Sequence, residues 1–119
     1  MSYDYCNIHR SGSESLLLSM VRIPNSFYHK AKGLLGERET KHTNMLFKKC
    51  NNIHMIGMKI PLDILFLSNE GVIVKSIPNL QPWRVAICFK ATMTLELASG
   101  SIKKMGLKQN MKLEIKECN

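Results

Sequence analysis

Short apolar segments separated by turn residues dominate the pattern along the chain. The last of them alternates strictly, with Met111, Leu113 and Ile115 on one face and charged residues between them, which is typical of a half-buried β-strand. Gly71 lies in a turn between two further segments, where a positive φ costs glycine little, so these segments predict a β-hairpin. Together with this last segment, the predicted strands are residues 16–23, 45–47, 60–67, 72–77 and 93–97.

Two segments have helical character. Asn25 and Ser26 suit the N-cap of a helix, because their side chains accept hydrogen bonds from first-turn amides. The apolar residues that follow them fall on one helical face: Phe27, Ala31, Leu34 and Leu35. Residues 99–105 predict a second short helix, which ends at Gly106.

These elements predict an α+β fold. Residues 1–15 lack periodicity, so we expect a flexible N-terminal tail there and a single β-rich domain over residues 16–119, with a proline-bounded loop at residues 78–83. The domain is expected to be a small barrel-like or packed antiparallel sheet with one or two short helices. The expected core consists of Phe27, Ala31, Leu34, Met45, Phe47, Leu62, Ile64, Phe66, Val72, Val74, Leu95, Leu97, Ile102, Leu107, Leu113 and Ile115.

Composition places the chain among ordinary globular proteins. It has 119 residues, of which 45% are hydrophobic and 22% charged, and no apolar run approaches the roughly 20 residues that span a bilayer. The N-terminal residues do not have the pattern of an export signal, so we expect a cytoplasmic protein. The four cysteines form no Cys-x-x-Cys pair, which favours free thiols over a structural zinc site.

The chain is basic, with 17 Lys and Arg residues against 9 Asp and Glu residues and a net charge of +8. The lysines are spread along the sequence, arginines are few, and aromatic residues are 7%. Base readout depends on arginine and base stacking on aromatic side chains, so this pattern argues against a specific nucleic-acid reader. A lysine-coated surface with weak attraction to polyanions is the remaining expectation.

Residues 50–67, Cys-Asn-Asn-Ile-His-Met-Ile-Gly-Met-Lys-Ile-Pro-Leu-Asp-Ile-Leu-Phe-Leu, resemble the core signature of the domain-of-unknown-function 192 family. Further segments fall in the family's order on both sides, and the resemblance covers roughly residues 21–115. These segments are Gly33-Leu34-Leu35-Gly36, Met45-Leu46-Phe47, Gly71-Val72-Ile73-Val74, Pro82-Trp83-Arg84, Cys88, Leu95-Glu96-Leu97-Ala98-Ser99-Gly100 and Met105-Gly106-Leu107.

The signature departs from the family's usual form at two positions. His54 and Gly57 stand where many members have Trp and Asn, and the Cys50…His54…Met58 pattern is instead similar to a bacterial subgroup of short members. The resemblance implies a small β-rich fold. It implies no particular activity, since the family is named for lacking one.

Cys50, His54 and Met58 are candidate metal ligands, because thiolate, imidazole and thioether groups suit Cu(I) or zinc. Their four-residue spacing allows chelation in a helix. In a strand, at about 3.3 Å per residue, Cys50 and His54 are about 13 Å apart and cannot share one ion. Cys88 from another strand could meet either one, as a ligand or in a Cys–His nucleophile pair. Ordinary core packing by Cys and Met is the alternative, and no cofactor is predicted.

Three further positions are candidate binding residues. Asp63 lies within an apolar strand, where its carboxylate either bonds neighbouring backbone amides or pairs with Arg84 or His54 in a pocket. Trp83 and Arg84 follow Pro82 on a loop, where they could anchor a partner or pack as a lid over the core. Glu96, by its alternation with Leu95 and Leu97, is expected at the surface.

Two functions remain open. The first is a small soluble non-catalytic binding or accessory module, whose partner is an unknown protein or a small anionic ligand. The second is a small metal-handling protein or enzyme that uses His54 with Cys50, Cys88 or Asp63. Because loops gather at one end of a β core, we expect His54, Asp63, Trp83 and Arg84 to converge on one face.

Overall fold

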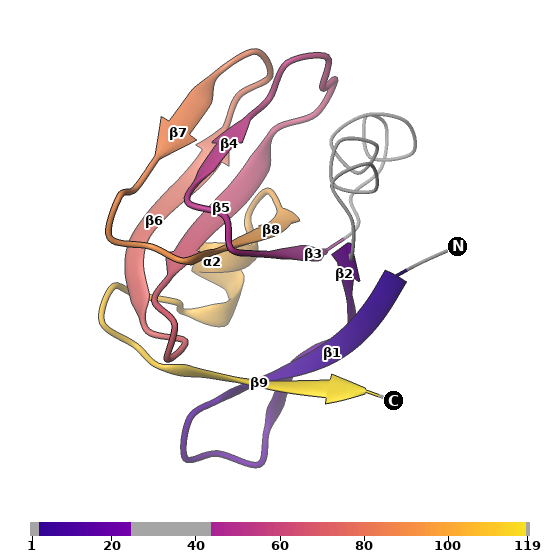
Figure 1. Ribbon diagram of the computed structural model, residues 1–119, viewed down its shortest axis with the longest axis vertical. Helices are drawn as coiled ribbons and strands as arrows, with labels where there is room; N and C mark the ends of the chain where they lie inside the picture. The colour runs from indigo at the N-terminus through magenta and orange to yellow at the C-terminus, as the bar shows by residue number, and fades with distance from the viewer. Residues whose placement is uncertain (1–2, 25–43, 119) are drawn as a thin grey trace.

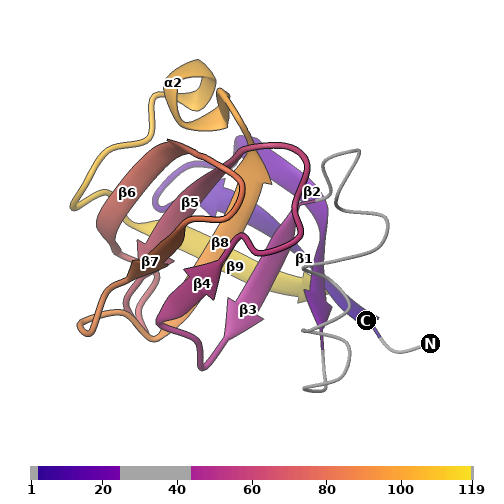
Figure 2. The ribbon, with the colours of Figure 1, turned by 90° about the horizontal axis from the view of Figure 1, so that it is seen from above.

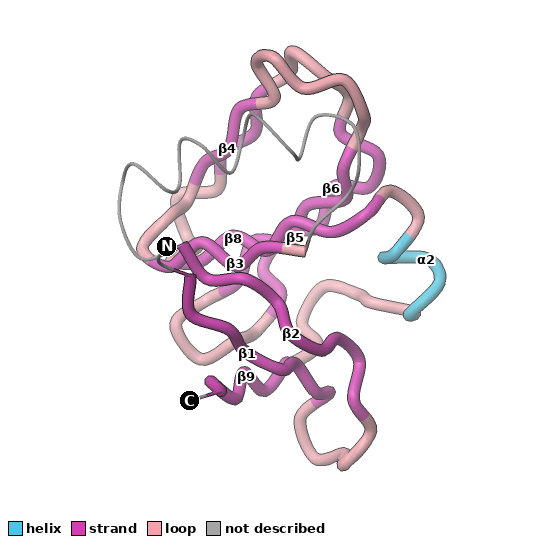
Figure 3. The backbone as a smooth tube through the Cα atoms, turned by 90° about the vertical axis from the view of Figure 1, so that its right-hand side faces the viewer, coloured by secondary structure: helices cyan, strands magenta, loops and turns pink. Residues whose placement is uncertain are grey.

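The computed structural model describes residues 3–24 and 44–118. Within these ranges the chain forms nine strands and one short helix (Figures 1 and 3). The elements are β1 (Tyr3–Arg10), β2 (Leu16–Pro24), β3 (Met45–Lys48), β4 (Asn52–His54), β5 (Leu62–Leu67), β6 (Ile73–Leu80), β7 (Val85–Ile87), β8 (Met93–Ala98), α2 (Ser101–Met105) and β9 (Leu113–Cys118).

Seven strands form one mixed sheet in the order β6-β5-β8-β3-β2-β1-β9. Neighbouring strands are antiparallel except β2 and β3, which pair in parallel. The sheet curls strongly (Figure 2). Among the described residues its two edges share one isolated bridge, Val72 with Lys112, rather than a continuous ladder. The predicted α+β, β-rich class is confirmed, and the sheet is curled and open rather than a closed barrel.

Strands β4 and β7 form a second, two-stranded sheet beside the large one (Figure 1). Strand β5, next to the edge strand β6, is buried along its whole length, because apolar clusters cover both of its faces. Leu65 belongs to the cluster on one face, with residues of β1, β2, β8 and β9. Ile64 and Phe66 belong to the cluster on the other face, which the small sheet covers. Two buried faces explain why β5 shows no alternation in sequence.

The covering sheet also corrects the expectation for Glu96. In register, Glu96 lies opposite Met45 on one side and Ile64 on the other, and both of these residues are in the second cluster. Glu96 is fully buried rather than exposed. Strand alternation separates two faces of a strand, and here both faces are inside the protein.

Besides β4 and β7, which were not among the predicted strands, two segments expected to be irregular are strands in the structure. Residues 3–10, expected in the N-terminal tail, form β1, which pairs with both β2 and β9 and buries Cys6 and Ile8. The expected loop at residues 78–83 is shorter, since β6 continues to Leu80. Pro78 is tolerated there because β6 is an edge strand, where a missing amide hydrogen breaks no ladder.

The other predicted elements agree with the structure where it describes them. Helix α2 ends at Gly106, which has a φ of 64°. In the predicted core, Val72, Val74 and Ile115 are half-buried and the other described members are buried. The predicted helix after Ser26, with Phe27, Ala31 and Leu34, lies outside the described residues. No helix in the described ranges is long and apolar enough to cross a membrane.

Phe66 should be among the residues on which stability depends most. It is fully buried in the second cluster, so Phe66→Ala removes a large ring from a packed interior. We expect urea denaturation to give a loss of about 3–5 kcal/mol in the free energy of unfolding. The matched variant Phe89→Ala changes a side chain that is 82% exposed, and should cost less than about 0.5 kcal/mol. A loss below about 1 kcal/mol for Phe66→Ala would contradict the packing described here.

The buried Cys6 thiol makes the free energy of unfolding depend on pH in the alkaline range. Burial, with smaller contributions from Cys118 and Glu117, raises the pKa of the Cys6 thiol from 9.0 to about 11. The folded protein holds this proton more tightly than the unfolded chain does, so the stabilisation is complete below about pH 9 and is lost as the pH rises toward 11. The expected loss is about 1.4 kcal/mol per pH unit in this window. Urea denaturation at several pH values should therefore give a flatter profile for Cys6→Val; equal slopes in the two proteins would refute the assignment.

Candidate functional site

The small sheet places His54 on an outward face. β4 and β7 pair antiparallel, with Ile53 opposite Ala86 and His54 opposite Val85. Ile53 is buried and Ala86 packs against the second cluster, so this pair faces inward. Successive side chains of a strand point to opposite faces, and His54 and Val85 are accordingly exposed.

Backbone hydrogen bonds join the end of β4 to the turn before β7. The amide of Met55 donates to the carbonyl of Arg84 at 2.7 Å, and the amide of Trp83 donates to the carbonyl of Met55 at 2.7 Å. These two bonds hold Met55 beside Trp83 and Arg84, although the two segments are about thirty positions apart in the sequence. They explain why His54 comes to lie near Trp83 and Arg84.

Trp83 occupies a position that normally favours glycine. The amide of Arg84 donates to the carbonyl of Gln81 at 3.3 Å, which closes a turn with Pro82 second and Trp83 third. Proline at the second position and a positive φ at the third are the pattern of a type II turn. Trp83 has a φ of 70°, a left-handed conformation that is costly for a bulky residue, and its side chain is 67% exposed. The turn thus presents an indole to solvent at an energetic cost to the backbone.

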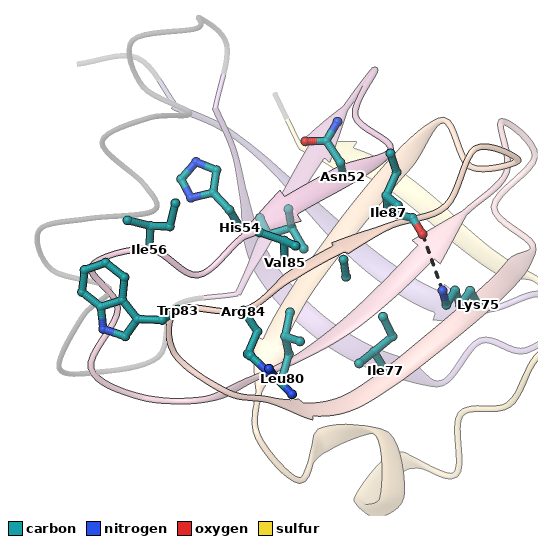
Figure 4. A pocket seen from close by; sticks show the side chains of 12 residues that line it. Asn52, His54, Ile56, Lys75, Ile77, Leu80, Trp83, Arg84, Val85 and Ile87 are labelled. Carbon is teal, nitrogen blue, oxygen red and sulfur yellow. Dashed lines mark hydrogen bonds between the residues drawn. The ribbon is translucent and has the colours of Figure 1, made fainter.

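A hollow of about 980 Å³ lies beside these residues (Figure 4). This volume is at the upper end of the range for small-ligand sites, about 300–1,000 Å³. Its apolar side chains come from β4, β6, β7 and the turns beside them, and its described lining has no Asp or Glu. The lining residues are Asn52, Ile53, His54, Ile56, Lys75, Ile77, Leu80, Trp83, Arg84, Val85, Ala86 and Ile87. The cations of the hollow are Lys75 and Arg84.

Asp63 does not line this hollow. Its carboxylate is fully buried and accepts hydrogen bonds from three backbone amides, those of Asn79 at 2.7 Å, Gly100 at 3.1 Å and Ile102 at 2.8 Å. The structure therefore supports the first alternative for Asp63, a carboxylate that bonds backbone amides. Of the four candidate binding residues, it brings together His54, Trp83 and Arg84.

The candidate metal ligands do not share one face. Met58 is buried in the second cluster, and the partly buried Cys50 and Cys88 pack against that cluster. His54 points outward. In the part of the chain that the structure describes, no three His, Cys, Asp or Glu side chains gather closely enough to hold a metal ion, and all four cysteines are free. The Cys50 thiol donates to the carbonyl of Asn52 at 3.0 Å.

Sequence reasoning missed the aliphatic part of the hollow. Ile77 and Leu80 come from β6, where a loop was expected to begin at residue 78, and Val85 and Ile87 come from β7, which was not predicted. The available signal was the sequence Val-Ala-Ile with a small residue between two large ones. Three residues are too few to establish a two-residue period.

The class of protein that the fold defines is a β-rich α+β domain, with a curled seven-stranded sheet covered on one face by a small two-stranded sheet. Residues 8–115 match the DUF192 family, described as "Uncharacterized ACR". The chain belongs to this family, as the resemblance in the sequence implied. No curated protein matches the chain.

Two solved structures share the fold. A candidate transcription regulator from Sinorhizobium meliloti is 21% identical, with a TM-score of 0.76 over 96% of this chain and 94% of its own. A protein of unknown function from Novosphingobium aromaticivorans is also 21% identical, with a TM-score of 0.71 over 91% of this chain and 83% of its own. At this identity the likeness extends to the fold alone.

Asp63 should be essential to stability and not to binding. In Asp63→Asn an amide NH₂ replaces one acceptor oxygen, and buried backbone amides lose their partner. Hydrogen bonds to charged groups contribute about 1.5–3 kcal/mol each, so we expect a loss of roughly 3 kcal/mol in urea denaturation. Asp4→Asn makes the same change at an exposed carboxyl and should have almost no effect. If Asp63→Asn left stability intact and abolished ligand binding, Asp63 would be a site residue after all.

Proposed function

We propose that this protein is a non-catalytic binding module and that the hollow beside His54, Trp83 and Arg84 is its binding site. The partner is a protein or a small ligand that combines an apolar body with an anionic group. The observation that carries this proposal is Trp83, a bulky aromatic residue at φ 70° with two-thirds of its side chain in solvent. Strain that contributes nothing to packing is typical of functional positions.

The composition of the hollow supports an anionic partner. Arg84 and Lys75 supply positive charge, and none of the described lining residues is acidic. The Arg84 guanidinium can donate two parallel hydrogen bonds to a carboxylate or phosphate. The surrounding isoleucine, leucine and valine side chains offer apolar surface, which favours a partner with more than a charged group.

The geometry gives the alternative function less support. An enzyme or metal-handling protein would use His54 with Cys50, Cys88 or Asp63. The Asp63 carboxylate is occupied by three backbone amides, and the two thiols pack against the second cluster while His54 is exposed.

Nucleic acid is a poorer fit than a protein or a small ligand. One structural neighbour is described as a candidate transcription regulator, but its likeness to this chain is at the level of the fold. Phosphate backbones are bound by several cations at once, and the hollow has two, Lys75 and Arg84. We also propose that the protein is located in the bacterial cytoplasm. Its four free thiols agree with this location, because the cytoplasm keeps cysteines reduced.

Replacing Trp83 by glycine should separate binding from stability. Trp83→Gly relieves the left-handed strain and removes an exposed side chain, so we expect the free energy of unfolding to change by less than about 1 kcal/mol. The same variant should bind anilinonaphthalene sulfonate, an anionic aromatic probe, at least about tenfold more weakly. Phe89→Gly is the matched control, because Phe89 is exposed but does not line the hollow.

Two outcomes would contradict the proposal. Equal probe binding by wild type, Trp83→Gly and Phe89→Gly would place the binding surface elsewhere. Incubation with a panel of anionic metabolites, followed by mass spectrometry, tests the alternative function. Conversion of a metabolite that is lost in His54→Ala would show an enzyme rather than a binding module.

A further inference from the structure

Exposed apolar side chains concentrate on the small sheet and its turns. Among the described residues, seven large apolar side chains are exposed, and four of them line the hollow. They are Ile56, Trp83, Val85 and Ile87, with exposed fractions of 47%, 67%, 70% and 46%. Contiguous apolar surface of this kind marks interaction sites in proteins that are otherwise well packed.

The backbone of β7 has an open edge beside this surface. In an antiparallel pair, opposite residues alternate between hydrogen-bonded and non-bonded positions. The amide of Cys88 donates to Asn51 at 2.9 Å and the amide of Met55 donates to Arg84, so both of these pairs are bonded positions. The alternation then makes Val85 and Ile87 non-bonded toward β4. Their amide and carbonyl groups point away from β4, at an edge with which no described strand pairs.

This open edge faces β6 across the hollow. The Lys75 ammonium group of β6 donates to the carbonyl of Ile87 at 3.5 Å, which fixes the direction of that carbonyl (Figure 4). Ile77 and Leu80 of β6 line the opposite side of the hollow. The space between the two strands is therefore bordered by main-chain groups on one side and apolar side chains on the other.

The two edges differ in how they are protected against strand pairing. β6 carries Lys75 and Pro78, and both are residues that proteins place on edge strands to prevent pairing. β7 has the sequence Val-Ala-Ile, without proline or charge of its own, and is limited by its length of three residues and by the Lys75 contact to Ile87. A short apolar edge of this kind can accept one extended segment of a partner.

Charge selects the chemistry of that partner. The net charge of +8 opposes docking of a second copy of this chain. Arg84 and Lys75 line the hollow, and none of its described lining residues is acidic. Acidic side chains on the partner are therefore complementary to the charge of the hollow. The aliphatic lining is better matched by peptide side chains than by a sugar-phosphate backbone.

We propose that the hollow between β7 and β6 binds an extended segment of a partner protein, with alternating acidic and apolar residues, which adds as a strand to the β7 edge. This inference rests on the proposed function and specifies its partner. Main-chain bonds to Val85 and to the amide of Ile87 supply affinity, and Lys75 turns from the Ile87 carbonyl to a carboxylate of the segment. Apolar side chains of the segment contact Ile77 and Leu80, and its carboxylates pair with Arg84 and Lys75.

The test uses a short synthetic peptide in which valine alternates with glutamate. Hydrogen exchange followed by NMR should show slower exchange at the amides of Val85 and Ile87 when the peptide is bound, by roughly tenfold or more. A peptide with lysine in place of glutamate should not bind. A peptide with alternate backbone nitrogens methylated, which cannot donate along that edge, should bind at least about tenfold more weakly.

Two matched variants test the location. Val85→Asp and Phe89→Asp add the same charge at exposed residues, but Val85 lines the hollow and Phe89 does not. Peptide binding should weaken about tenfold in Val85→Asp and less than about twofold in Phe89→Asp. Equal effects of the two variants would overturn the proposed location.

The outcomes separate this inference from the proposed function. If the peptide bound without protecting Val85 and Ile87, or bound equally well when methylated, strand addition would be refuted while the binding module would stand. If an oligonucleotide bound in its place, with the same dependence on Val85, the partner class would be wrong. If neither the peptide nor anilinonaphthalene sulfonate bound in a Trp83-dependent way, both proposals would fall.

Discussion

The buried carboxylate of Asp63 is the interaction on which the arrangement of this fold depends. It lies in the buried strand β5 and accepts hydrogen bonds from the amides of Asn79, Gly100 and Ile102. These amides belong to the end of β6, the turn after β8 and the first turn of α2. An ionised carboxylate removed from water is tolerated where several donors compensate for the lost hydration. One side chain thus joins three segments that are 16, 37 and 39 residues away in sequence.

The same interaction positions the candidate site. Asn79, whose amide donates to Asp63, has a φ of 55°, and its side-chain oxygen accepts from the Ser99 hydroxyl at 2.7 Å. Its carbonyl accepts from the side chain of Gln81 at 3.2 Å. The chain leaves this fixed point directly into the turn that carries Trp83. The far side of the turn is held by the backbone of Met55. The indole is therefore displayed from a turn anchored at both ends, which limits the entropy lost when a partner binds.

Sequence patterns predicted those parts of the fold in which burial follows a simple period. β9 alternates because one of its faces meets solvent, and β5 forms an uninterrupted apolar run because both of its faces are covered. The prediction that Glu96 is exposed was wrong because both faces of β8 are also covered. No local pattern in the sequence indicates that a second sheet lies over the outer face of β8. β1 was missed because the alternation of its two buried residues, Cys6 and Ile8, covers only three positions, which is too few to establish a two-residue period. The approach of His54 to Trp83 and Arg84 was expected from their place beside loops, whereas the edge of β7 depends on strand register, which the sequence does not show.

Two features of the small sheet would each lower stability in isolation, and both occur at the same place. A tryptophan occupies a left-handed position, and a short apolar strand edge without proline or charge of its own faces water. Most other described left-handed positions hold glycine or asparagine, as at Gly71, where a side chain would collide with the carbonyl of Leu113, although Met20 and Lys49 are left-handed too. The β6 edge carries lysine and proline. The hollow differs from those positions in that a left-handed, exposed aromatic residue and an apolar strand edge occur side by side there, which supports the proposed binding role. The side chains of Trp83, Val85 and Ile87 belong to neither buried cluster, so the packing that stabilises the fold does not depend on them.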